Sequence, residues 1–198
     1  MSAGFLLRWF GRSCFVAAAV VAGYLIWVMW GTGFITSQAQ GDLRSQLAPL
    51  LEHPMSPPAD PASEPIHLTG DAYAEIVIPR MSLDMIVVQG TDTASLMKGP
   101  GHYPHTADPW DDTGRVAIAG HRTTYLHPFW NLDKMQPGDP IQLATEYGTF
   151  DYRVTKTAIV APTATQVAEP TVKPTLILTT CNPRFSASQR IVVFADRL

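Results

Sequence analysis

The chain has 198 residues, of which 46% are hydrophobic and 16% charged, and its 14 basic side chains face 17 acidic ones for a net charge of −3. This mildly acidic balance argues against a nucleic acid as partner, since domains that bind nucleic acids carry basic patches. The sequence shows no internal repeat, no phosphate-binding glycine loop and no cysteine-rich metal pattern. Outside the apolar N-terminal region about 160 residues remain, which is enough for one packed core.

The first feature in chain order is an apolar run near the N-terminus. Residues 14–35 contain no charged side chain and are long enough to cross a bilayer as a helix. Arg8 and Arg12 precede the run, and the next charge is Asp42. Because basic flanks stay on the cytoplasmic side, we expect a cytoplasmic N-terminus over 1–12 and an extracellular remainder.

A cleaved signal peptide is the alternative interpretation of this run, because signal peptides also begin with basic and apolar residues. The run is longer than a usual signal core, and its outer end is bulky where a signal peptidase requires small residues. Trp27 and Trp30 suit the aromatic belt of a membrane interface. We therefore predict an uncleaved transmembrane helix over 13–35 in a single-pass protein of the cell membrane.

The next stretch, 36–70, is loosely patterned and then rich in proline. The segment HPMSPPADPASEP, 53–65, is typical of a spacer with extended, polyproline-like character. Residues 41–53 are compatible with a short helix inside it. We expect an extracellular, poorly fixed spacer over 36–70 and a folded domain over 71–198.

From residue 71 onward, the chain reads as short strands separated by proline and glycine. Helical turns are expected only at 93–99 and 126–135. The predicted strands are rich in β-branched and aromatic residues and cover 73–79, 83–89, 115–121, 140–145, 150–161, 174–181 and 189–195. Seven or more strands without a long helix between them predict an all-β barrel or sandwich.

Strand alternation groups the candidate functional residues. In RVAIAGH, 115–121, His121 shares a face with Ala117 and Ala119, which leave a shallow groove beside it. If the last two strands form a hairpin, Arg190 lies opposite Cys181, with the β-carbons roughly 5 Å apart. A thiol and a guanidinium would then be neighbours.

These residue types suit nucleophilic catalysis. Cys14 lies in or beside the membrane, so Cys181 is expected to be an unpaired thiol outside it. A thiolate is the nucleophile and nearby positive charge favours it, while acyl transfer also needs an oxyanion donor and an acid for the leaving amine. Arg190 and His121 supply those roles, although the spacing alone does not bring His121 to Cys181. An inert buried cysteine in a membrane-tethered binding module is the non-enzymatic alternative.

Several segments together carry a family resemblance. TLILTTC at 175–181 with Arg190, VAIAGHR at 116–122, IPRMSLDMIVVQG at 78–90 and GPGHYP at 99–104 resemble the sortases, which are membrane-anchored cysteine transpeptidases of Gram-positive bacteria. The likeness runs from about residue 72 to the C-terminus. Within that family, the segments AGHRTTY and LTTCNPRFSASQR are most similar to the class E sortases typical of actinobacteria.

The resemblance implies a closed eight-stranded β-barrel and assigns three catalytic roles. Cys181 matches the nucleophile, His121 the acid/base, and Arg190 the arginine that holds the oxyanion or substrate. Arg122 and Arg184 compete for the last role, but the strand register favours Arg190. The substrate-binding candidates are Thr180, Tyr125 and Ala119.

The implied reaction is cleavage of a C-terminal LPXTG- or LAXTG-like sorting motif between Thr and Gly, through a thioacyl enzyme. The partners would be secreted proteins with a sorting signal, the amine of a peptidoglycan precursor or a pilin lysine, and membrane lipid around the N-terminal helix. Polymerisation of pilins and hydrolysis by a thiol protease remain alternatives. No cofactor is expected.

Two departures from the family pattern concern the rim of the groove. The loop HTADPWDDTGR, 105–115, is bulky and acidic where many sortases have small residues, and Leu126 follows TTY where class E usually has glycine. Asp108, Asp111 and Asp112 in this loop could bind calcium, but a solvated loop is the favoured interpretation. We also expect that His102, His105, His121 and His127 do not form a metal site, since no cysteine or carboxylate completes a recognisable ligand spacing with them.

Overall fold

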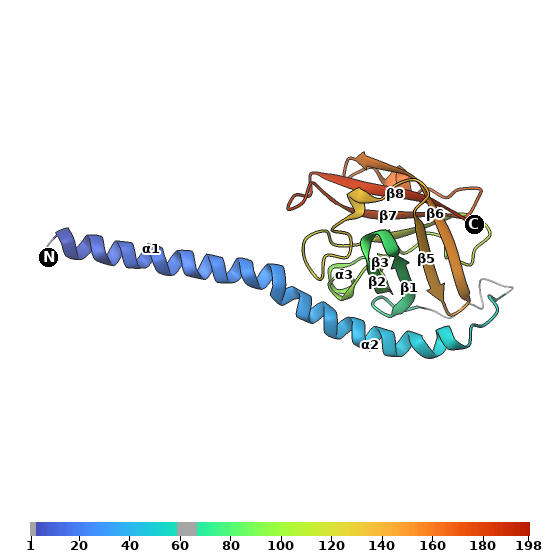
Figure 1. Cartoon of the computed structure of the whole chain (residues 1–198), viewed down its shortest axis with the longest axis horizontal. Coiled ribbons are helices and arrows are strands. Elements are labelled where there is room, and N and C mark those ends of the chain that lie inside the picture. The colour runs from blue at the N-terminus through green and yellow to red at the C-terminus, as the bar shows by residue number, and fades with distance from the viewer. Residues whose placement is uncertain (1–2, 59–66) are drawn as a thin grey trace.

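The structure, a computed structural model, describes residues 3–58 and 67–198. Within these residues, eight strands close into a barrel in the order β1-β2-β3-β4-β7-β8-β6-β5 (Figure 1). The pairs β2–β3 and β4–β7 are parallel, and the other neighbours are antiparallel. The strands are Ala72–Ile78 (β1), Leu83–Gln89 (β2), Gly101–His102 (β3), Arg115–Ala119 (β4), Pro140–Thr145 (β5), Gly148–Val160 (β6), Thr175–Asn182 (β7) and Gln189–Arg197 (β8).

The expected all-β class and the closed eight-stranded barrel are confirmed. Seven strands coincide with predicted runs, whereas β3 was missed because two residues are too few to show an alternation. The expected helical turns correspond to α3 (Thr93–Lys98) and to the short turn η4 (Leu132–Lys134). Two further short turns are η3 (Pro79–Met81) and η5 (Thr165–Ala168).

The barrel interior is filled by the inward side chains of its strands. Val116 and Ile118 of β4 belong to the main core, while Ala117 lies in a separate cluster on the outer face with Ile177 and Val192. This is the period-two alternation expected for a strand. The outer face of β4 and β7 is therefore free of the main core and carries the candidate site.

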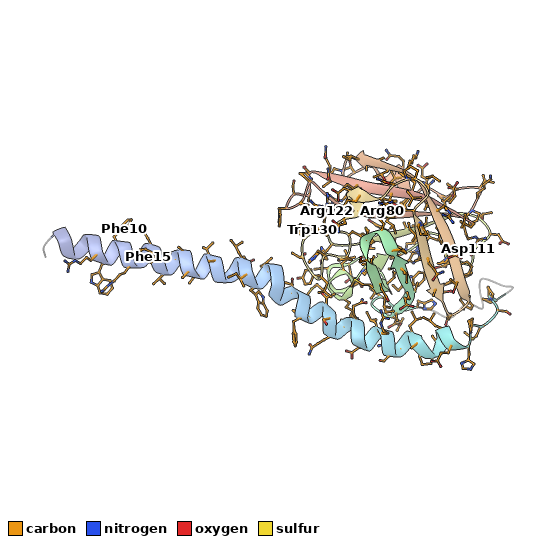
Figure 2. All side chains as sticks on the ribbon, viewed as in Figure 1. Phe10, Phe15, Arg80, Asp111, Arg122 and Trp130 are labelled. Atoms are coloured by element: carbon orange, nitrogen blue, oxygen red, sulfur yellow. The ribbon has the colours of Figure 1, made fainter. Side chains whose placement is uncertain are left out.

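Two long helices precede the barrel. Helix α1 (Ala3–Ile26) continues through a π-helical segment, η1 (Trp27–Gly31), into α2 (Thr32–Glu52). Figure 1 shows α1 projecting away from the barrel and α2 running along it. Among the described residues, the one helix long and apolar enough to cross a membrane is Arg8–Ile26, and Phe10 and Phe15 stand out from it without cover (Figure 2).

Two N-terminal expectations can be compared with these helices. The predicted span 13–35 overlaps the candidate Arg8–Ile26 and also includes Thr32 and Gly33, which are buried in the first turn of α2. The expected poorly fixed spacer over 36–70 does not hold for 36–52, which is helical and packed. The proline-rich stretch falls partly on 59–66, outside the described residues, and the domain boundary at 71 stays a prediction.

Helix α2 is attached to the barrel by one side chain in every turn. The hydroxyl of Thr36 donates to the Met97 carbonyl at 2.8 Å. The Gln40 amide accepts from the Ile86 N–H and donates to the Ile86 and Lys98 carbonyls, at 2.7 to 2.9 Å. Arg44 pairs with Glu75 and Asp84 on β1 and β2. Since residues four apart lie on one face of a helix, this stripe holds α2 along its length.

The apolar contact under α2 adds to these bonds. Leu43 and Leu47 are buried with Ile86 and Val88 in a cluster of their own, outside the barrel core. Burial of two leucines stabilises such a contact by roughly 3–6 kcal/mol. Helix α2 is thus part of the folded domain.

Candidate active site

The strand pair β7–β8 positions the cysteine and the arginine. The antiparallel register places Cys181 directly opposite Arg190, as the sequence predicted. Cys181 is a free, partly exposed thiol one residue before the end of β7. Ile177 lies in the outer-face cluster and Leu176 and Leu178 in the core, so alternation carries Cys181 outward.

His121 emerges from the neighbouring strand. In the parallel pair β4–β7, Ala119 lies opposite Thr179, and the Gly120 N–H still donates to the Thr179 carbonyl at 3.1 Å. His121 and Cys181 each follow two residues after that pair, so they leave the same end of two adjacent strands. This tertiary pairing brings together residues that are 60 positions apart.

The strand β4 ends at Ala119, two residues earlier than predicted, so the alternation expected to place His121 on the face of Ala119 does not extend to it. The Phe129 N–H donates to the His121 carbonyl at 3.1 Å, which turns the chain into the β4–β5 loop. Only glycine fits at position 120, because a Cβ there would lie 2.6 Å from the Phe129 ring. The loop is therefore closed onto the end of β4 by one aromatic contact and one backbone bond.

The imidazole of His121 lies in a partly desolvated place. Burial lowers its pKa below the ordinary value, because the charged form loses hydration. Its Nε2 atom is buried and has no hydrogen-bond partner among the described residues. The Tyr125 ring lies 4.9 Å from the imidazole, centroid to centroid. The imidazole thus packs beside a ring of its own loop, and no described group bonds to its Nε2.

Arg190 is held by the loop that joins β7 to β8. Its Nη1 donates to the carbonyls of Ala187 and Gln189, both at 3.0 Å. The guanidinium has further donors in a planar fork, which suits an oxyanion or a peptide carbonyl.

The three predicted substrate-binding residues fall in different places. Thr180 is buried, and its hydroxyl donates to the Gly120 carbonyl at 2.7 Å, so it ties β7 to the start of the histidine loop. Ala119 is buried at the end of β4. Tyr125 contacts His121 and lies next to the helix α2, since its N–H donates to the Thr32 hydroxyl at 3.3 Å. Tyr125 therefore touches a predicted catalytic side chain.

Arg122 has no catalytic role in the sequence-based prediction, but in the structure it contacts the backbone of the predicted nucleophile. Arg122 is buried, and its Nη1 donates to the Cys181 carbonyl at 3.3 Å and to the Asn182 side chain at 2.6 Å. Its Nη2 pairs with Asp133 at 3.2 Å, which also pairs with Arg184. The alternation used to set Arg122 aside required the strand to continue, but β4 ends at Ala119, and Arg122 lines the same hollow as Cys181.

Two hollows flank the Cys181–Arg190 pair. The first, of about 330 Å³, lies on the outer face of β4, β7 and β8 under the β6–β7 connection and is lined by Arg190, Tyr103 and Thr179. Tyr103 and Thr179 share a hydrogen bond of 3.1 Å there. The second, of about 410 Å³, contains Cys181 and Phe185. Arg190 thus lines the first hollow and Cys181 the second.

The acidic loop has its own partners. Asp108 accepts a short hydrogen bond from the Tyr73 hydroxyl, and Asp111 accepts from the Asp108 N–H at 2.8 Å. Asp112 is exposed and pairs with Arg197. Over residues 3–58 and 67–198, no group of three or more histidine, cysteine or acidic side chains is arranged to hold a metal ion.

The barrel carries a cysteine and an arginine paired across β7–β8, and a histidine two residues after the end of the adjacent strand β4. The family profile described as Sortase domain matches residues 76–198. The chain belongs to the sortase family.

Individual relatives agree with this assignment. Sortase D of Bacillus subtilis is 36% identical over 135 residues, covering 66% of each chain. Sortase SrtE1 of Streptomyces coelicolor is 29% identical over 140 residues, covering 63% of this chain and 40% of that protein. The crystal structure of S. coelicolor sortase E1 with a tripeptide in the active site superposes with a TM-score of 0.61 at 27% identity, over 65% of this chain and 89% of that one. The chain thus spans just under two thirds of the first curated relative and less than half of the second.

Proposed function

We propose that this chain is a membrane-anchored cysteine transpeptidase that acts on sorting motifs outside the cell. The observation that carries the proposal is the cross-strand pair Cys181–Arg190 beside the end of β4, which His121 follows after two residues. A hollow on each side of the pair supports a peptide substrate, since the acyl and the leaving portions need separate space. The tripeptide in the S. coelicolor sortase E1 active site is consistent with such a substrate.

The proposed chemistry proceeds in two balanced steps. The Cys181 thiolate attacks the carbonyl carbon of the motif's threonine, and Arg190 stabilises the oxyanion. The bond to the glycine nitrogen breaks while His121 gives that nitrogen a proton, which leaves a thioacyl enzyme. An acceptor amine then attacks the thioester, His121 takes its proton, and the sulfur leaves as thiolate.

The proposed location places the N-terminus in the cytoplasm and the barrel outside. Helix α1 has the length and composition of a membrane anchor or a signal. Arg8 and Arg12 at its N-terminal end favour a cytoplasmic start. The acceptor on the outer side would be an amine of a peptidoglycan precursor.

The test is mass spectrometry of the protein after incubation with LPXTG and LAXTG peptides. We expect Cys181 to gain the mass of the peptide up to threonine, and an added amine such as triglycine to appear in the product. Water in place of the amine, at the same rate with and without triglycine, would point to a hydrolytic thiol protease. No adduct with any peptide, despite a freely alkylated Cys181, would overturn the enzymatic proposal.

A further inference from the structure

The second hollow joins the site to the membrane helix. It is lined by Leu25 and Val28 of the N-terminal helices as well as by Cys181 and Phe185. Leu25 lies within the candidate span, which ends at Ile26, and Val28 follows two residues later. At 1.5 Å per residue, Val28 lies about 3 Å beyond the end of the span. One wall of this hollow therefore lies at the depth where α1 would leave the bilayer.

The attachment of the helix to the barrel fixes this geometry. The Thr32 hydroxyl accepts from the Tyr125 N–H, and Gly33 faces Leu126, with the glycine's Cβ position 3.2 Å from the leucine side chain. Thr36 and Gln40 continue the attachment along α2. The first turn of α2 thus rests on the β4–β5 loop, so the outer end of α1 is held next to the site.

The rim on this side exposes apolar side chains. Phe185, at the β7–β8 loop, is 70% exposed, Trp27 is 59% exposed, and Leu126 is 41% exposed. Phe185 is supported edge-on by the Trp130 ring at 6.0 Å, and the Arg184 guanidinium lies over that ring at 4.6 Å. Aromatic rings beside a basic group suit a membrane–water interface, where one end is apolar and the other is wet.

The opposite end of the molecule differs. Figure 2 shows Trp130 and Arg122 at the end of the barrel toward α1, and Asp111 at the other end. Val172, also strongly exposed, lies next to the start of β7, since Thr171 bonds Gly114 there. Phe185 lines the second hollow together with Leu25 and Val28 of the N-terminal helices, whereas Val172 precedes the opposite end of β7.

We propose that the rim formed by Phe185, Leu126, Leu25 and Val28 lies in the interfacial layer of the outer bilayer surface, with phospholipid headgroups and upper acyl chains as its partner. Cys181 then faces the lipid surface through the second hollow. The inference rests on the membrane anchoring proposed above.

The experiment places spin labels on the full-length chain in phosphatidylglycerol nanodiscs, in a background with Cys14→Ser and Cys181→Ala. Single cysteines are introduced by Phe185→Cys, by Val172→Cys as the matched exposed control, and by Val20→Cys in α1. Accessibility of each label to apolar oxygen and to a water-soluble nickel chelate reports its depth. Ala187→Cys, on the same loop as Phe185, repeats the measurement at an exposed neighbour.

We expect the Phe185 and Ala187 labels to favour oxygen several-fold more than the Val172 label does, and the Val20 label to be deepest. If the labels at 185 and 187 have the same ratio of oxygen to nickel-chelate accessibility as the label at 172, while the label at 20 lies deep in the bilayer, the inference is overturned and the anchoring stands. An aqueous ratio at 20 would overturn the anchoring and the inference together. Neither outcome depends on peptide turnover, so the proposed transpeptidase activity is tested separately.

Discussion

The two faces of β7 both carry threonine, but the inner face packs into the fold and the outer face lines the candidate site. Leu176 and Leu178 point into the barrel core, and Thr180 is buried with its hydroxyl on the Gly120 carbonyl. On the outer face, Thr179 lines the first hollow and Cys181 the second. Adjacent threonines therefore differ because successive side chains of a strand point to opposite sides, and substitutions on the two faces should separate stability from activity.

Removal of the outer-face thiol should have the largest effect. Cys181→Ala is expected to abolish both peptide cleavage and transfer, because the other free cysteine, Cys14, lies in the candidate membrane span. The melting temperature should change little, since the side chain is partly exposed at the end of the strand. Cys14→Ala, on the exposed face of α1, is the matched control and should retain activity. More than trace turnover by Cys181→Ala would contradict the cysteine mechanism.

His121→Ala should lower the rate of cleavage roughly 10²–10⁴-fold, as expected for loss of a general acid/base. His127 lies in the same loop but is exposed and packs on Trp130, so His127→Ala should retain near-normal turnover. The measurement is single-turnover formation of the acyl enzyme, followed by its transfer to triglycine. Formation and transfer at the normal rate in His121→Ala would assign the acid to another group.

Arg190→Lys tests whether charge or geometry matters on the outer face. Lysine keeps the charge but lacks the planar fork, so we expect kcat to fall roughly 10²-fold, as for loss of an oxyanion donor. The rate of Cys181 alkylation by iodoacetamide should change little. Arg190→Ala, compared in parallel, should lose at least as much kcat. Near-normal kcat in the lysine variant, or strongly slowed alkylation, would show that Arg190 acts on the thiol instead of the substrate.

A buried histidine, away from the outer face of β7, should make the stability of the fold depend on pH. His102 is buried, stacked on the Tyr73 ring, and burial lowers its pKa from 6.5 to about 4. Between these pH values the unfolded chain binds a proton that the folded chain does not, so the free energy of unfolding should fall by about 3 kcal/mol as the pH drops through this window.

The measurement is urea unfolding of wild type, His102→Gln and His105→Gln between pH 7 and pH 4. His102→Gln should remove this part of the dependence of the unfolding free energy on pH, while His105→Gln, at an exposed position, should keep it. An equal slope in wild type and His102→Gln would show that other groups carry the acid sensitivity.

The smallest expected effects distinguish the adjacent threonines. Thr180→Val should destabilise the fold by about 1–3 kcal/mol, because the buried Gly120 carbonyl loses its donor. Thr179→Val should leave the melting temperature nearly unchanged and alter KM for the peptide, because its hydroxyl lies in the first hollow with Tyr103. A larger loss of stability in Thr179→Val than in Thr180→Val would contradict the assignment of the two faces.

Residue patterns within short segments of the sequence determined most strands of the barrel and the Cys181–Arg190 pair of the candidate site. The alternation in TLILTTC and the loop length between β7 and β8 were sufficient to place Arg190 opposite Cys181, because a hairpin's register depends on residues close in the chain. The apolar run that became α1 was equally plain, since its length and lack of charge are local properties.

Only the tertiary structure decided which distant segments meet. His121 comes to the end of the strand beside Cys181 because β4 and β7 pair in parallel, and nothing within either segment specifies that neighbour. Arg122 supports the Cys181 carbonyl, and α2 lies along the barrel through Gln40, for the same reason: these contacts depend on how the barrel closes. Short-range periodicity indicates which face of an element is apolar, but the partner that covers that face is chosen by the packing of the whole chain.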